Sequence, residues 1–165
     1  PNHTDAANNL GIILVNQKRY EEALSNYQAL LDAGGGTAYV HGNMANLLAM
    51  MGREDEAFIH FQRALSLDPR DALVHCNYGV ILEKAGQVEK AIAHYSEAIR
   101  LDPGMVEPYC RMARLLEKKG HSNKARAILE MARQRDPTAC SGAPDVNVDL
   151  PSLEKERIAG HVQQP

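Results

Sequence analysis

Residues 38–71 read AYVHGNMANLLAMMGREDEAFIHFQRALSLDPRD, and residues 72–105 read ALVHCNYGVILEKAGQVEKAIAHYSEAIRLDPGM. When the two stretches are aligned, small, apolar and proline residues fall at the same positions along their whole length. The same pattern continues, at the same interval of 34 residues, over residues 4–37 and 106–139. Self-similarity at a fixed period is the signature of a repeat architecture, so we interpret the chain as four tandem repeats.

Individual positions show what the repeats share. The eighth position is small (Gly11, Ala45, Gly79, Ala113), the twentieth is alanine (Ala23, Ala57, Ala91, Ala125), and the twenty-fourth is large and apolar (Tyr27, Phe61, Tyr95, Leu129). Within each half of a repeat the apolar residues recur at helical spacing. Lys18 or a glycine breaks the pattern in the middle. Each repeat is therefore predicted to form two short helices.

These positions resemble those of the tetratricopeptide repeat proteins, whose unit is a helix-turn-helix of 34 residues. The resemblance covers residues 4–137 and implies an all-α fold, a right-handed superhelical solenoid of four helix-turn-helix repeats. The repeats span residues 4–37, 38–71, 72–105 and 106–139. A single repeat cannot bury its apolar face alone, so we expect neighbouring repeats to stack.

The ends of the chain depart from the pattern. Residues 1–3 fall on the last three positions of a preceding repeat, so we expect a fragment of a longer array. Residues 140–165 are expected to hold a linker and a capping helix near residues 152–162, or else a tail that occupies the groove as a pseudo-ligand. In the first repeat, residues 33–36 (AGGG) replace the Asp-Pro that closes the other three. Glycine has high backbone entropy, so this joint is predicted to be more mobile than the others.

The resemblance also implies a binding surface, because in this family the first helix of each repeat lines a concave groove. Carried onto this chain, the candidate surface comprises ten residues: Asn9, Ile12, Tyr39, Asn43, Asn46, Leu73, Asn77, Val80, Arg111 and Arg114. The sixth position of successive repeats holds asparagine three times and then Arg111.

An asparagine amide has both a donor and an acceptor, so a row of them can pair with the backbone of an extended peptide. The row resembles that in the repeat arm of O-linked N-acetylglucosamine transferases, where asparagines hold the substrate backbone. Tyr39, Leu73, Ile12 and Val80 would then contact peptide side chains. The alternative is that asparagine reflects a helix-surface preference or hydrogen bonding between repeats.

The fourth repeat is basic, with eight Lys and Arg against four Asp and Glu. Arg111 and Arg114 are therefore expected to bind an acidic group of the partner. Pairing with Glu107 and Glu117 on the same helix is the alternative. Clamping of an acidic chaperone tail is disfavoured, since Gly42 and Glu107 occupy the places of that clamp's two lysines.

Composition excludes several functions. The net charge is −3, tryptophan is absent and phenylalanine occurs twice, which argues against nucleic-acid binding. No apolar run reaches the roughly 20 residues of a membrane span. The chain has no glycine-rich phosphate loop, nucleophile elbow or zinc-protease motif. We therefore expect no enzyme activity, no cofactor and no membrane contact.

The histidines and cysteines are candidate metal ligands. His41 and His75 share the fourth position, and His60 and His94 share the twenty-third. Each pair is expected on adjacent repeats, about 8–10 Å apart, which favours structural histidines over a metal site. Cys76 and Cys110 share the fifth position at the same separation, too far for a disulfide. With Cys140 they are expected to be reduced, which favours a cytoplasmic location.

The sequence thus predicts a scaffold or adaptor that binds an extended protein segment in its concave groove. One alternative is the substrate-recruiting arm of a larger enzyme such as a glycosyltransferase. A second alternative is a self-associating assembly module whose exposed repeat edges stack.

Overall fold

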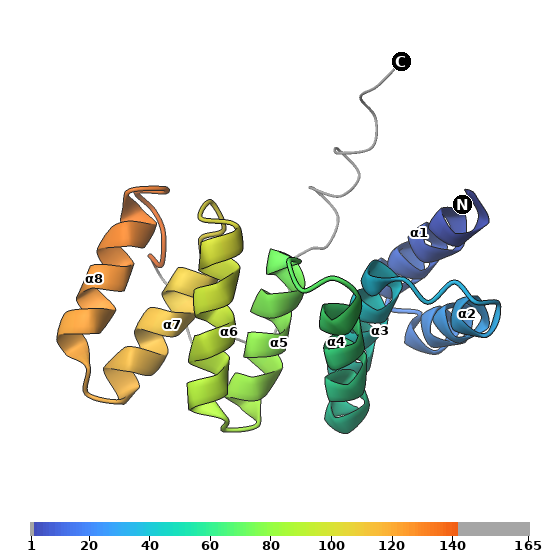
Figure 1. The fold of residues 1–165 in the computed structure, drawn as a ribbon, viewed down its shortest axis with the longest axis horizontal. Coiled ribbons are helices and arrows are strands. Elements are labelled where there is room, and N and C mark those ends of the chain that lie inside the picture. Colours follow the sequence, from blue (N-terminus) through green and yellow to red (C-terminus); the bar gives the residue numbers. More distant parts are fainter. Residues whose placement is uncertain (1, 142–165) are drawn as a thin grey trace, which may run out of the picture. The chain divides into compact units, whose positions relative to one another are not determined.

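The computed structural model describes residues 2–141 and folds them into eight helices joined by short turns (Figure 1). Their bounds are α1 (Asn2–Asn16), α2 (Tyr20–Asp32), α3 (Ala38–Met50), α4 (Glu54–Leu67), α5 (Ala72–Lys84), α6 (Val88–Leu101), α7 (Glu107–Lys118) and α8 (Ser122–Arg133). Residues 2–141 contain no β-strand. The predicted all-helical fold with two helices in each repeat is confirmed.

The helices form two compact units. Unit 1 contains α1–α4 and ends at Leu67, and unit 2 contains α5–α8 and begins at Asp68. In each unit, consecutive helices pack as two hairpins, and the second helix of one hairpin contacts the first helix of the next. Helix α1 begins at Asn2, within the three residues that the sequence pattern assigned to a preceding repeat. The expected capping helix at residues 152–162 lies outside the described residues.

The core of each repeat lies between its two helices. The alanine at the twentieth position is buried in all four repeats. The large ring of Tyr27, Phe61 or Tyr95 is fully buried beside it, while Leu129 in the last repeat is partly buried. The small and the large side chain lie one turn apart on the second helix of the repeat, and both are buried against the first helix, which gives dense packing.

The eighth position matches the ring that it faces. A Cβ added to Gly11 would lie 2.5 Å from a ring carbon of Tyr27, and one added to Gly79 would lie 2.6 Å from the Tyr95 ring. Both distances are far inside van der Waals contact. In the second repeat, alanine at this position (Ala45) accompanies phenylalanine (Phe61). Glycine is therefore required where the facing ring is a tyrosine.

The turn between the two helices is the same in every repeat. The fifteenth position has a positive φ in each case: 60° at Lys18, 75° at Gly52, 71° at Gly86 and 77° at Gly120. In the first repeat the N–H of Lys18 donates to the Val15 carbonyl at 2.9 Å, and that of Arg19 to Leu14 at 2.9 Å. This pair of bonds is the Schellman motif, for which glycine has the lowest backbone strain.

The glycine run after α2 forms a defined turn. Gly34 has a φ of 80°, its N–H donates to Leu31 at 3.0 Å, and the N–H of Gly35 donates to Leu30 at 2.9 Å. The run therefore closes α2 by a second Schellman motif, where the later repeats use Asp-Pro. Greater mobility of this joint stays a prediction.

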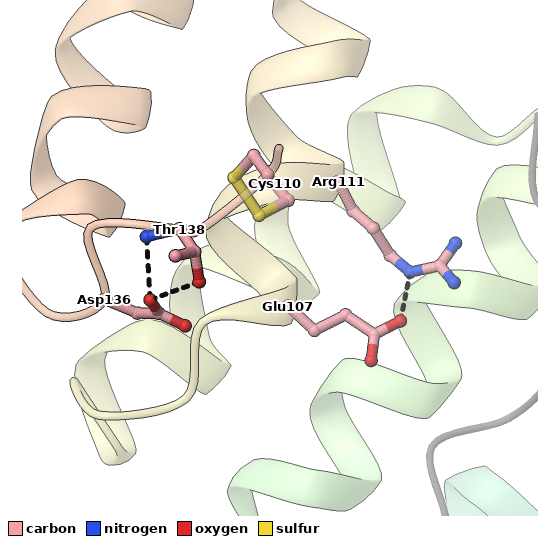
Figure 2. The surroundings of a disulfide bond; sticks show 6 residues. Glu107, Cys110, Arg111, Asp136 and Thr138 are labelled. Atoms are coloured by element: carbon pink, nitrogen blue, oxygen red, sulfur yellow. Dashed lines mark hydrogen bonds and ion pairs between the residues drawn. A yellow bond between two sulfur atoms is a disulfide. The ribbon is translucent and has the colours of Figure 1, made fainter. Parts of the chain in front are cut away.

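One expectation from the cysteines is wrong. Cys110 on α7 and Cys140, after α8, form a disulfide (Figure 2). The chain turns back onto α7 after α8: Ala139 packs with Tyr109 and Ala132, and the Arg135 guanidinium lies 4.8 Å from the centre of the Tyr109 ring. The 34-residue pattern does not describe this return, so the sequence did not bring Cys140 to Cys110. Cys76 is a free, buried thiol.

We predict that Gly79→Ala lowers the free energy of unfolding by about 1–3 kcal/mol, because its methyl group overlaps the fully buried Tyr95 ring. Urea unfolding followed by circular dichroism measures this change. The matched control is Ala113→Gly, at the same position of the other repeat in unit 2, where Leu129 replaces the ring. Equal stability of Gly79→Ala and the wild type would contradict the packing argument.

Candidate functional site

Two side-chain hydrogen bonds join the first helices of unit 1. The Tyr39 hydroxyl donates to Asp5 Oδ1 at 2.7 Å, and Asn43 Nδ2 donates to Asn8 Oδ1 at 2.8 Å. Asn43 and Asn8 are both buried, with exposed fractions of 3% and 7%. Asn43 therefore forms the inter-repeat bond that the sequence left open as the alternative to peptide binding.

Asn46 differs from Asn43. It is also buried, but its Oδ1 atom has no hydrogen-bond partner among residues 2–141. Asn9 is exposed on α1 and Ile12 is partly buried. Of the four candidate residues of unit 1 other than Asn43, Asn46 therefore carries a buried amide oxygen without a partner among residues 2–141.

In unit 2, α5 presents an asparagine with the same property. Asn77 is 1% exposed, and its Oδ1 atom likewise has no partner among the described residues. Val80, one turn further along α5, is buried, and Leu73, one turn earlier, is partly buried. A buried oxygen without a partner is uncommon in native proteins, because desolvating it costs about 1–3 kcal/mol.

Both arginines of the candidate surface are bonded to carboxylates. Arg111 Nε donates to Glu107 Oε1 at 2.7 Å, as Figure 2 shows, and its Nη1 lies 3.7 Å from Glu83. Arg114 donates to the other oxygen of Glu83 at 2.9 Å. Two cations and two anions thus form a neutral network.

Glu83 is the centre of this network, and its role was not predicted from the sequence. It also accepts a 2.7 Å hydrogen bond from the Tyr95 hydroxyl. The available signal was an acidic residue at the twelfth position of the third repeat, 31 residues before Arg114. Arg114 was expected to bind an acidic group of the partner, with pairing to Glu117 on its own helix as the alternative, and it instead pairs with Glu83 on α5.

The environment of the network keeps Arg111 charged. Burial alone would lower the pKa of Arg111, but its hydrogen bond to Glu107 and the charges of Glu107 and Glu83 raise it overall. Burial raises the pKa of the neighbouring Cys76 thiol to about 12, so it is not a thiolate at neutral pH. The site therefore offers neither a reactive thiolate nor an unpaired cation.

The histidines pair differently from the expectation. His41 on α3 meets His60 on α4, and His75 on α5 meets His94 on α6, with 2.9 Å between the Nδ1 atoms in each pair. The sequence analysis compared histidines of adjacent repeats and did not predict these pairs, which form because the fourth and twenty-third positions face each other within one repeat. A shared spacing of 19 residues was the signal that could have shown this.

Residues 2–141 contain neither a group of three metal-binding side chains nor a membrane-spanning helix. No group of three or more His, Cys, Asp or Glu side chains is arranged to hold a metal ion there. None of the helices in that range combines the length and the apolar content of a membrane span.

Several solved structures have a fold similar to this one. MamA has a TM-score of 0.76 at 20% identity, over 84% of this chain and 81% of MamA. PilF of Pseudomonas aeruginosa has 0.75 at 21%, over 82% and 62% of the two chains. YrrB, described as a TPR protein with an unusual peptide-binding site, has 0.70 at 22%, over 81% and 69%. At these identities the likeness shows the fold alone.

No curated protein matches the chain in sequence. Family models of the tetratricopeptide repeat do match: one covers residues 3–70 and again 36–104, and another covers residues 82–141. Together these matches extend over nearly all of the described residues, and the chain therefore belongs to the tetratricopeptide repeat proteins.

Proposed function

We propose that the chain is an adaptor without catalytic activity of its own, which binds an extended segment of a partner protein along the first helices of its repeats. The observation that carries the proposal is the buried, unpartnered Oδ1 atom of Asn46 in unit 1 and of Asn77 in unit 2. An N–H group of a peptide backbone would satisfy each oxygen and remove its desolvation penalty.

The asparagines then have two different roles. Asn43 holds α3 to α1 through Asn8, so it contributes to the stability of unit 1. Asn46 and Asn77 contact the ligand. Peptide recognition through backbone groups is insensitive to sequence, so selectivity falls to partly buried apolar neighbours: Leu73 in unit 2 and Ile12 in unit 1. Val80 is fully buried and would only support that surface.

The two arginines need a different account from the one that the sequence suggests. An acidic ligand group would have to compete with Glu83 and Glu107, which already pair with both guanidinium groups, although Arg114 Nε has no hydrogen-bond partner among residues 2–141. We propose that Arg111 and Arg114 mainly hold α7 against α5, and that the partner segment need not be acidic there. Removing one partner of such a buried pair leaves the other charge uncompensated.

YrrB supports the class of function, since a peptide-binding site is named for that protein on a similar fold. The role of a substrate-recruiting arm would use the same surface and is a variant of this proposal. The cytoplasmic location also stays a proposal. The Cys110–Cys140 disulfide weighs against it, because disulfides persist mainly in oxidising compartments.

A specific observation favours a second function, association between copies through α1. Leu10 and Ile13 are 48% and 50% exposed, whereas their equivalents in the second repeat, Met44 and Leu47, are buried. Sedimentation of Ile13→Lys against the wild type tests this: the wild type should associate as its concentration rises and the variant should stay monomeric. Two monomeric proteins would contradict it.

For the peptide proposal, we expect Asn46→Ala and Asn77→Ala each to weaken binding about fivefold to tenfold, the loss of one hydrogen bond. The probe is a fluorescent peptide selected with the wild-type chain from a random displayed library, and fluorescence polarisation measures its dissociation constant. Asn123→Ala, at an exposed position on α8, is the control. A library that yields no binder, or a double variant with wild-type affinity, would contradict the proposal.

We predict that Arg111→Gln lowers the free energy of unfolding by about 2–3 kcal/mol, because Glu83 and Glu107 lose a buried partner. Arg126→Gln, at an exposed position on α8, should change it by less than about 0.5 kcal/mol. Chemical denaturation measures both variants. If Arg111→Gln kept full stability and peptide binding became less sensitive to salt, Arg111 would be a ligand-binding cation instead.

A further inference from the structure

We propose that His75 and His94 form a two-nitrogen binding site for a divalent transition-metal ion of the zinc class, with a weaker copy at His41 and His60. This site is separate from the proposed peptide surface and does not depend on it. Water would complete the coordination, because the protein supplies two ligands.

The spacing of the nitrogens carries the proposal. Two ligand nitrogens bound to one ion at about 2.0–2.1 Å, with an angle of about 90–109° between the bonds, lie about 2.8–3.4 Å apart. The two Nδ1 atoms lie 2.9 Å apart in both pairs. Packing of α5 against α6 therefore already holds them at chelating distance, with no movement of the backbone required.

In the unliganded pair a proton joins the two rings. The ring centres of His75 and His94 are 5.1 Å apart, which places both nitrogens close to the line between the centres, as in a direct hydrogen bond. A metal ion takes the place of this proton after the rings turn enough for the two lone pairs to converge. Neutral imidazole is the form of histidine that binds metals.

The neighbours of His75 and His94 favour replacement of the shared proton by a metal ion. His75 Nε2 lies 3.2 Å from the Pro69 carbonyl oxygen, so the N–H of His75 donates there and its Nδ1 carries a lone pair. A metal-binding histidine commonly makes this kind of bond to a carbonyl. His94 has only to move its proton from Nδ1 to Nε2, which changes neither the charge nor the proton count.

The surroundings of His94 are compatible with a bound cation. The carboxylate of Glu97, on the same helix, places negative charge near the ring. The Tyr78 ring packs against His94, with 4.6 Å between the ring centres.

The pair formed by His41 and His60 is less suited to a bound cation. The positive charge of Arg63 acts on His41, although Glu56 places a negative charge near His60. Both carboxylates are bonded to arginines, Glu56 to Arg53 and Glu97 to Arg100, so they do not distinguish the two pairs. Within residues 2–141, His41 Nε2 has no carbonyl partner equivalent to Pro69, so its tautomer is not fixed in the same way. We therefore expect the first equivalent of metal at His75 and His94.

The direct test uses the full, ¹⁵N-labelled chain with its disulfide intact, titrated with Zn²⁺ alone at pH 7. Long-range ¹H–¹⁵N spectra of the imidazole rings report which nitrogen carries the proton. We expect the first equivalent of Zn²⁺ to shift both Nδ1 signals of His75 and His94 and to convert His94 to the Nε2–H form. Unchanged His75 and His94 spectra at saturating Zn²⁺ would overturn the proposal.

Equilibrium dialysis against Zn²⁺ gives an independent readout. We expect His94→Gln, which keeps a hydrogen-bond donor for His75, to weaken the tightest site at least tenfold. The double variant His94→Gln, His60→Gln should also lose the binding of a second Zn²⁺ ion. His121→Gln, at an exposed position outside both pairs, is the control and should bind as the wild type. Circular dichroism checks that each variant is folded, and wild-type binding by the double variant would contradict the assignment.

Discussion

The whole structure depends on how closely the two helices of each repeat approach. The first helix offers glycine or alanine at the eighth position, and the facing ring of Tyr27, Phe61 or Tyr95 on the second helix fills the space that a larger residue would take. The alanine at the twentieth position, also on the second helix, is buried as well. With helices at this distance, the fourth and twenty-third positions also meet, which is why the histidines pair within a repeat. Packing and side-chain chemistry therefore have the same cause.

The asparagines of the first helices look equivalent in the sequence but differ in what surrounds them. Asn43 has a partner within unit 1, because the fifth position of the preceding repeat is Asn8. The Oδ1 atoms of Asn46 and Asn77 have no hydrogen-bond partner among residues 2–141. The proposed peptide binding rests on this difference.

The sequence predicts the fold almost completely, because a repeat shows each packing position four times. Small, large and turn-forming positions could be identified by comparing Gly11, Ala45, Gly79 and Ala113, and the structure confirms them. Features that belong to one repeat could not be predicted in this way. The network around Glu83 and the return of Cys140 to Cys110 each occur once, and the periodic pattern carries no signal for them.

We propose that Asn46 and Asn77, and not Asn43, contact the bound peptide. Side-chain amide signals in ¹H–¹⁵N spectra of the chain, recorded with and without the selected peptide, distinguish these residues. We expect large shifts for the Asn46 and Asn77 amides on binding, with those of Asn43 and Asn8 nearly unchanged because their mutual hydrogen bond persists. Shifts confined to Asn43 and Asn8, or absent from all four, would show that Asn46 and Asn77 do not bind the peptide.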